Sequence, residues 1–275
     1  MTFHGLELQL QRVTGLYRRV DLAYPSNRLA VIVSVVASTL VAIITRNVSM
    51  AILCGATTFS SWALGRELDP DRSRTANLSA ITVGLMLNVL ALNGRLIFQD
   101  TLLGALVTGA LMVMARVMTR STGLAATTLD AAALLAVGLG TGLVNPHVAM
   151  ILVAVATLGI ILDRAFEHHP YLENWCWFGF ASLALTALYF LWSSGTWLVL
   201  TGIVFAVGTL NIVLALKSTP SSSSDIGTRL EPSRLAMTCM LVFLAATGLA
   251  SQGLPVAILG LLAVGLWRLW LYPPN

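Results

Sequence analysis

The chain has 275 residues, of which 57% are hydrophobic and only 10% are charged, and its formal net charge is +4. Soluble domains carry about 25% charged residues, so this composition excludes an ordinary water-soluble protein and indicates that most of the chain lies in lipid. The basic residues cluster between apolar runs, as membrane topology requires, so the basic excess does not indicate nucleic-acid binding.

The N-terminal segment, residues 1–27, carries apolar residues at helical spacing, while its arginines fall largely on other positions. This pattern predicts a cytoplasmic amphipathic helix that lies on the membrane surface with arginines facing lipid phosphates. The alternative is a frayed polar tail. The apolar residues of this pattern are Leu6, Leu10, Val13, Tyr17 and Val20.

Apolar runs of membrane-spanning length then follow one another with short breaks. Each has about the 17–25 residues that a helix needs to cross the hydrocarbon core. We therefore expect an all-α, polytopic integral membrane protein with about ten transmembrane helices. The expected spans are 29–46, 48–65, 77–93, 101–118, 123–143, 147–164, 175–192, 197–216, 235–252 and 254–271.

The loops predict the orientation. With the N-terminus inside, the outer loops hold only Arg46 and Arg95, and every other basic residue lies on the inner side, which is a strong positive-inside bias. The sequence therefore predicts a bacterial-type cytoplasmic (inner) membrane with both termini in the cytoplasm. The inner residues are Arg12, Arg18, Arg19, Arg28, Arg66, Arg72, Arg74, Arg116, Arg120, Arg164, Lys217, Arg229, Arg234 and Arg268.

A serine-rich cytoplasmic linker, 217–234, separates an eight-helix membrane domain, 28–216, from a C-terminal transmembrane hairpin, 235–275. Within the eight spans, a pair of spans, an acidic inner loop and a second pair of spans occur twice. This pattern is compatible with two four-helix repeats, 28–120 and 121–216, and short outer turns with charged inner loops also produce it by chance.

The densest cluster of ionisable groups is the loop Trp62–Arg74, which holds the acids Glu67, Asp69 and Asp71 among three arginines. The interleaved signs are typical of an ion-pair network in the headgroup layer. The alternative is a site for a hard cation such as Mg²⁺, since carboxylate oxygens are the ligands that this ion prefers.

The second acidic loop holds Asp163 and Glu167, which share a helix face because they are four residues apart. The adjacent His168 and His169 cannot both point the same way on a helix. A solvated loop is the favoured interpretation, and metal binding is the alternative.

Three polar residues lie inside expected spans and are candidates for a substrate path. Asp130 falls about eight residues into the fifth span, where a carboxyl is costly and usually lines a cavity or pairs with another group. Asn88 and Asn211 add polarity to the third and eighth spans. Their alternative role is to join helices by hydrogen bonds.

The two acidic loops, after the second and sixth spans, resemble the layout of the UbiA-type intramembrane prenyltransferases. That family carries N-D-x-x-D-x-x-x-D in the first loop and D-x-x-x-D in the second. Arg66-Glu67-Leu68-Asp69 is similar to the end of the first motif, and the segment from Asp163 to Glu167 approximates the second. With Asp69 on the last aspartate, the earlier motif positions fall on Ser61, Trp62 and Gly65. The resemblance implies carboxylates that bind Mg²⁺ and the diphosphate of a polyprenyl donor.

Three functions stay open. The first is a permease- or flippase-like transporter of a hydrophobic or amphipathic molecule, favoured by the span count and by the lack of any P-loop, nucleophile-elbow or metalloprotease motif. The second is a Mg²⁺-dependent prenyltransferase-like enzyme. The third is a non-catalytic membrane subunit or scaffold. No cofactor is expected except Mg²⁺ for the enzyme, and the expected partners are the lipid bilayer and a membrane protein that docks on the cytoplasmic loops.

Overall fold

The computed structural model describes Thr14, Leu16 and the ranges 20–168, 198–217, 230–251 and 255–271. All regular structure in these ranges is helical. The helices are α2 (Pro25–Thr45), α3 (Val48–Leu68), α4 (Ser73–Leu92), α5 (Phe98–Thr119), α6 (Thr128–Gly140) with a 3₁₀ turn η1 (Thr141–Leu143), α7 (Pro146–His168), α9 (Leu198–Lys217), α10 (Pro232–Ser251) and α11 (Pro255–Leu271).

The helix starts have local causes in the sequence. Four helices (α2, α7, α10 and α11) begin at a proline, whose fixed φ and missing N–H suit the first helical position. The side chain of Asn47 caps α3 by accepting from the Met50 N–H at 3.0 Å. Thr127 and Asp130 form a reciprocal capping box at the start of α6.

Six of the described helices (α2, α3, α4, α5, α7 and α10) are long and apolar enough to cross a membrane. The all-α fold of a multi-pass membrane protein is therefore confirmed at this level, whereas the count of ten spans is not. Three further apolar helices, α6, α9 and α11, contain shorter apolar stretches. The expected span 175–192 and most of the predicted amphipathic segment 1–27 lie outside the described residues.

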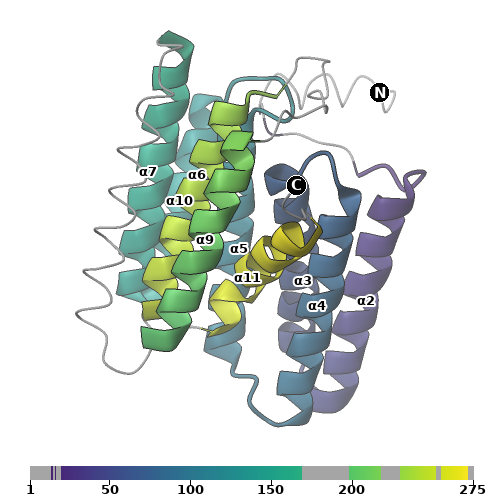
Figure 1. Ribbon diagram of the computed structural model, residues 1–275. Helices are drawn as coiled ribbons and strands as arrows, with labels where there is room; N and C mark the ends of the chain where they lie inside the picture. The colour runs from purple at the N-terminus through teal and green to yellow at the C-terminus, as the bar shows by residue number, and fades with distance from the viewer. Residues whose placement is uncertain are drawn as a thin grey trace, which may run out of the picture.

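The helices form two groups with α5 and α11 between them (Figure 1). The helices α2, α3 and α4 pack on one another, while α7 packs on α6 and α10, and α10 packs on α9. The central helix α5 contacts α3 on one side and α6, α7 and α10 on the other. Helix α11 crosses obliquely and contacts α3, α4, α5, α9 and α10, so it ties the two groups together.

Glycines allow the close approach of α11. A Cβ atom added at Gly265 would lie 2.5 Å from Cγ1 of Val207 and 2.8 Å from Cζ of Phe243. A Cβ atom at Gly260 would lie 2.5 Å from Oγ of Ser61. Since real Cβ contacts are longer, a larger residue at either position would force a neighbouring side chain to shift.

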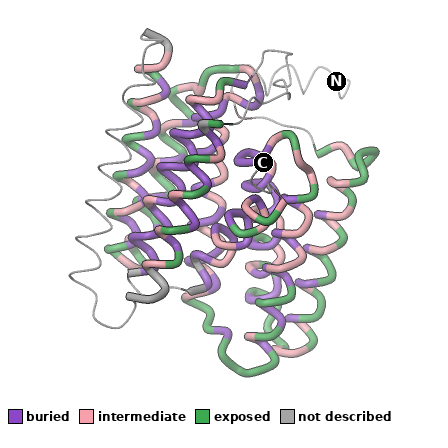
Figure 2. The backbone as a smooth tube through the Cα atoms, viewed as in Figure 1, coloured by how far each residue is buried: buried purple, intermediate pink, exposed green. Residues whose placement is uncertain are grey.

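Burial places the C-terminal helices at the centre of the molecule (Figure 2). The apolar window of α10 is 89% buried, whereas that of α2 is only 22% buried. The helices α10 and α11, which correspond to the last two expected spans, pack inside the bundle. The outward face of α2 carries large apolar side chains suited to lipid, namely Ile32, Val35, Val36, Leu40 and Ile43.

Candidate functional site

Buried charged residues gather at one end of the bundle, which we call the charged end. The helices α3, α5, α7 and α11 end there, and α4, α6 and α10 begin there, as the contacts between their terminal residues show. The charged end is defined by the residues Glu67, Asp69, Arg116, Arg120, Asp130, Asp163, Arg234 and Arg268.

The first ion pair joins α3 to α5. The Glu67 side chain is fully buried, and its Oε1 lies 2.9 Å from Nε of Arg116. The hydroxyl of Thr119, one turn nearer the end of α5, donates to Oε2 at 3.3 Å. Because both carboxylate oxygens have donors from α5, this buried charge is compensated across the interface between the two helices.

The second ion pair joins three helices. Asp163 of α7 is 3% exposed. It accepts two N–H bonds from Arg120, at 2.8 and 3.0 Å, and a third from Arg234 of α10 at 2.6 Å. The Arg234 guanidinium also donates to the Met118 carbonyl at 3.2 Å and lies over the Phe166 ring. Bidentate arginine–carboxylate pairs of this kind are strong and directional.

The last turn of α5 connects the two ion pairs. Arg116 and Arg120 are four residues apart, and they hold Glu67 of one helix group and Asp163 of the other. Arg120 is also the residue that ends α5, and its φ of 50° lies in the left-handed region that non-glycine residues rarely adopt. That backbone turn occurs where its side chain binds Asp163.

Asp69 forms a third buried group, in the turn after α3. Its carboxyl is 1% exposed, and it accepts a hydrogen bond from the Thr75 hydroxyl of α4. Burial raises the pKa of the Asp69 carboxyl above its ordinary value, although the charges of Arg268 and Arg72 act in the opposite direction. The environment of Asp69 therefore favours the neutral acid more than water does.

Arg268 of α11 is the buried cation near Asp69. It is 1% exposed, and its guanidinium donates to the Cys239 sulfur at 3.0 Å and to the Asn211 carbonyl at 3.4 Å. Sequence reasoning placed Arg268 among the topology-setting basic residues and missed this role. The signal was a lone arginine between Trp267 and Trp270 in an apolar run.

The structure places Asp130 nearer to a helix start than the sequence predicts. The expected span began at residue 123, but α6 begins at Thr128, so Asp130 lies in the first helical turn. There its Oδ2 accepts the backbone N–H of Thr127 at 2.8 Å and the Thr127 hydroxyl at 2.9 Å. The Thr14 hydroxyl of the N-terminal segment donates to Oδ1. The carboxyl is thus 4% exposed but well supplied with donors.

The two candidate asparagines lie apart from Asp130 and from each other. Asn88 joins α4 to α2, since its amide donates to the Gly84 carbonyl at 2.8 Å and to the Ala37 carbonyl at 3.5 Å. Asn211 joins α9 to α11 by donating to Gly265 at 3.1 Å. The described contacts are those of interhelical hydrogen bonds.

The remaining predicted acids of the two loops are Asp71 and Glu167. Asp71 is exposed, while the side chain of Glu167 and all of His169 lie outside the described residues. Among the residues that the structure does describe, no three His, Cys, Asp or Glu side chains are placed to hold a metal ion. The described carboxylates of the two loops contact arginines and threonines instead.

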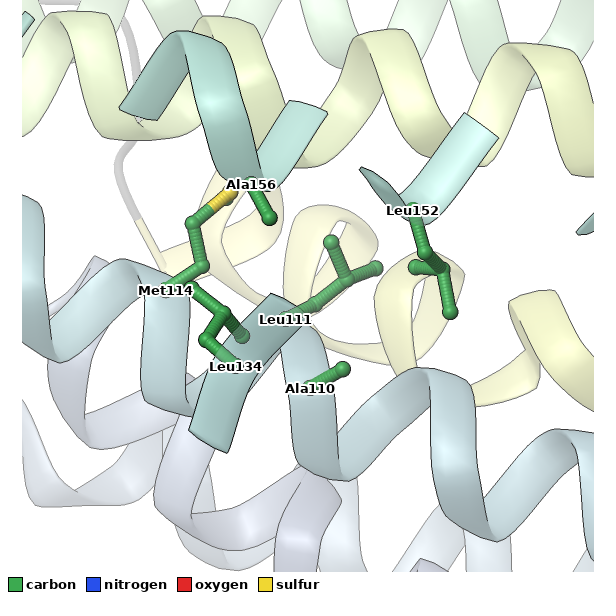
Figure 3. A pocket seen from close by; sticks show the side chains of 6 residues that line it. All are labelled: Ala110, Leu111, Met114, Leu134, Leu152 and Ala156. Carbon is green, nitrogen blue, oxygen red and sulfur yellow. The ribbon is translucent and has the colours of Figure 1, made fainter. Parts of the chain in front are cut away.

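A small apolar pocket lies between α5, α6 and α7 (Figure 3). Its cavity volume is about 10 Å³, far below the roughly 300–1,000 Å³ of typical ligand sites. None of the polar candidates lines it. The lining residues are Ala110, Leu111, Met114, Leu134, Leu152 and Ala156.

Comparisons with protein-family models, with curated proteins and with solved structures found no match to this chain.

Proposed function

We propose that the protein is a permease- or flippase-like transporter of an amphipathic molecule and that the ion pairs of the charged end form its closed gate. The observation that carries the proposal is that two buried ion pairs meet on the last turn of α5. Arg116 holds Glu67 of one helix group, and Arg120 holds Asp163 of the other. Buried ionisable groups in membrane proteins are costly and commonly mark a transport pathway.

The arrangement of the helices supports a gate rather than a fixed brace. Two helix groups meet through α5 and the oblique helix α11, so small rotations of the groups would concentrate at these contacts. Ion pairs are suited to such a contact because their geometry is either formed or broken, and a broken pair is compensated by water at the bundle end.

The described geometry favours transport over the Mg²⁺-dependent enzyme. A diphosphate site needs several carboxylate oxygens directed at one cation, whereas Glu67 and Asp163 direct theirs at arginines. The small apolar pocket is compatible with a closed state of a transporter. The small size of this pocket also favours the alternative function, a non-catalytic subunit, because a subunit needs no substrate cavity.

The test is lipid movement in liposomes that contain the purified protein and an NBD-labelled phospholipid. Dithionite bleaches only the outer leaflet, so bleaching beyond the outer-leaflet fraction reports transfer across the membrane. We expect transfer well above that of protein-free liposomes. A parallel assay with a fluorescent amphipathic cation in place of the labelled lipid tests whether the protein acts as a permease.

The gate is tested in the same assay by Asp163→Asn, which weakens the bonds to Arg120 and Arg234. A loss of about 1.4 kcal/mol from the closed state would raise the open fraction about tenfold, so transfer should be faster. The matched control is Glu231→Gln, because Glu231 contacts Arg234 at 3.5 Å but is 61% exposed. Transfer equal to that of protein-free liposomes with both probes would refute the transporter, and co-purification with a membrane partner would then support the subunit.

A further inference from the structure

Asp69 differs from the other buried acids of the charged end in its hydrogen-bond donors. Glu67 and Asp163 each have an arginine nitrogen within 2.9 Å of a carboxylate oxygen. Asp69 is equally buried, but its hydrogen-bond donor is the neutral hydroxyl of Thr75. In the part of the chain that the structure describes, no ion pair within 4.0 Å reaches the Asp69 carboxyl.

A hydroxyl does not compensate a buried negative charge as a guanidinium does. The charged and titratable groups around Asp69 come from three elements. Arg72 and Asp71 lie in the turn before α4, Arg268 lies on α11, and the Cys239 thiol lies on α10. The arginines act at a distance, and the net effect of this environment is a raised pKa for the Asp69 carboxyl, with burial as the largest cause.

The carboxyl lies where α11 is held against the rest of the bundle. Trp267 donates from its indole N–H to the Thr82 hydroxyl of α4 at 2.8 Å. The guanidinium of Arg72 donates to the Leu271 carbonyl at the end of α11. Asp69 therefore occupies the junction of α3 and α4 with α11, the oblique helix that ties the two groups together.

We propose that Asp69 is a proton-binding site whose carboxyl is protonated in the closed bundle and releases its proton to water when α11 moves against α3 and α4. The O–H bond of the acid breaks, the electron pair stays on the carboxylate, and water at the charged end accepts the proton. A carboxylate at this position requires water or a direct arginine contact, and each of these requires the junction to rearrange.

The direction of the coupling follows from linkage. A proton binds more tightly to the closed bundle than to a state with a hydrated carboxyl, so protonation favours the closed state and raising the pH favours the rearranged one. The inference rests on the proposed transport function in that it names a proton as the coupling ligand. The binding of the proton is nevertheless measurable without any transported substrate.

The experiment places spin labels on the exposed positions Leu85 of α4 and Leu266 of α11, in protein held in lipid nanodiscs. The buried Cys54 and Cys239 stay in place, and Cys176 is replaced by Ser. Between roughly pH 5 and pH 9, which brackets the range of a raised carboxyl pKa, we expect the interlabel distance distribution to shift. Infrared difference spectra should show loss of a protonated-carboxyl C=O band over the same range.

Two variants make the outcome specific. Asp69→Asn is permanently neutral, so its distances should stay at the low-pH distribution at every pH and its infrared band should be missing. Asp100→Asn, which changes an acid in the first turn of α5 at the opposite end of the bundle, should retain the wild-type shift. The inference would be overturned if the interlabel distances of the wild-type protein did not change with pH and no carboxyl C=O band titrated. This result does not depend on whether the variants fold. A distance shift that is retained in Asp69→Asn would also overturn the inference.

The two proposals fail separately. A pH-dependent distance shift without lipid or dye transfer would refute the transport function and keep the proton site. Transfer in liposomes that is independent of pH, with no distance shift, would keep the transporter and refute the proton site.

Discussion

At the scale of single residues, the charged groups of the charged end take their partners from distant parts of the chain. Glu67 lies beside Arg66 in sequence, but its described ion pair is with Arg116, and Asp163 pairs with Arg120 and Arg234. The reason is geometric, since residues on one helix turn point in different directions while a neighbouring helix presents its side chains directly. The stability of this end therefore depends on pairs between helices.

The ion pair around Asp163 gives a first prediction. Asp163→Ala leaves the guanidinium of Arg234 buried without its carboxylate, and breaking such a pair costs about 3–5 kcal/mol. We expect a clear fall in the melting temperature in detergent and in the free energy of unfolding from SDS titration. Glu231→Ala is the control, with an expected change of less than about 1 kcal/mol because its carboxylate is 61% exposed. Equal effects of the two variants would contradict the buried pair.

Asp69 gives a prediction about pH. Because the pKa of its carboxyl is raised in the folded protein, the folded state binds more protons than the unfolded chain. Its contribution to stability is complete below the ordinary carboxyl pKa and is lost as the pH rises through the raised value. Asp69→Asn should therefore flatten the pH dependence of the melting temperature in that window, while Asp100→Asn, at the opposite end of the bundle, keeps the wild-type slope. The same slope in Asp69→Asn and wild type would count against the raised pKa.

At the scale of elements, local caps decide where helices begin and glycines decide how closely they cross. The shortest described α-helix, α6, has 13 residues and depends on the reciprocal cap of Thr127 and Asp130. Helix α11 has 17 residues and depends on two glycines for its contacts with α3, α9 and α10. Single substitutions in these two helices therefore test the cap and the close crossing directly.

The cap of α6 gives a third prediction. Thr127→Ala removes the acceptor for the Asp130 N–H and one donor to its carboxylate, and loss of a cap typically costs about 1 kcal/mol. Hydrogen exchange, followed by mass spectrometry, should be faster in α6 than in wild type. The matched control is Thr128→Ala at the next, exposed position, which should leave exchange unchanged. Identical exchange in the two variants would show that the cap does not hold α6.

The crossing of α11 gives a fourth prediction. Gly265→Ala places a methyl group 2.5 Å from Cγ1 of Val207, and overpacking of this kind costs about 1–3 kcal/mol. We expect a lower melting temperature in detergent. Gly202→Ala in α9 is the control, because a Cβ there meets nothing within 4 Å, and it should be neutral or slightly stabilising. A Gly265→Ala protein as stable as wild type would mean that α11 packs less closely than described.

At the scale of the whole molecule, the described basic residues divide between the two ends of the bundle. Arg46 and Arg95 lie in the turns at one end, whereas the arginines of the ion pairs lie at the other. The partition that the loops predict from sequence is thus reproduced by the helix order. Which end faces the cytoplasm follows from the positive-inside rule alone and stays a prediction.

That orientation gives a fifth prediction. A green fluorescent protein fused to the C-terminus should be fluorescent in bacteria, and alkaline phosphatase inserted at Gly94, in the turn with the positive φ of 63°, should be active. Phosphatase inserted after Asp71, at the charged end, is the control and should be inactive. The reverse pattern of activities would invert the topology.

The sequence alone predicts the helical membrane class, and it places the start of each described helix to within about five residues. Composition selects lipid as the solvent, and prolines and polar caps fix helix starts locally, so α3 begins at Val48 and α11 within one residue of the expected position. It failed for Asp130, because an apolar run does not reveal that residues 123–127 precede the helix.

Only the tertiary structure decided which groups meet. The pairing of Glu67 with Arg116, of Asp163 with Arg120 and Arg234, and the burial of Asp69 near Arg268 all join residues far apart in the chain. The central position of α10 and α11 is likewise invisible in their hydropathy, because lipid and a helix interface select the same apolar side chains. Partners of buried charges depend on how helices pack, and helix packing is a property of the whole bundle.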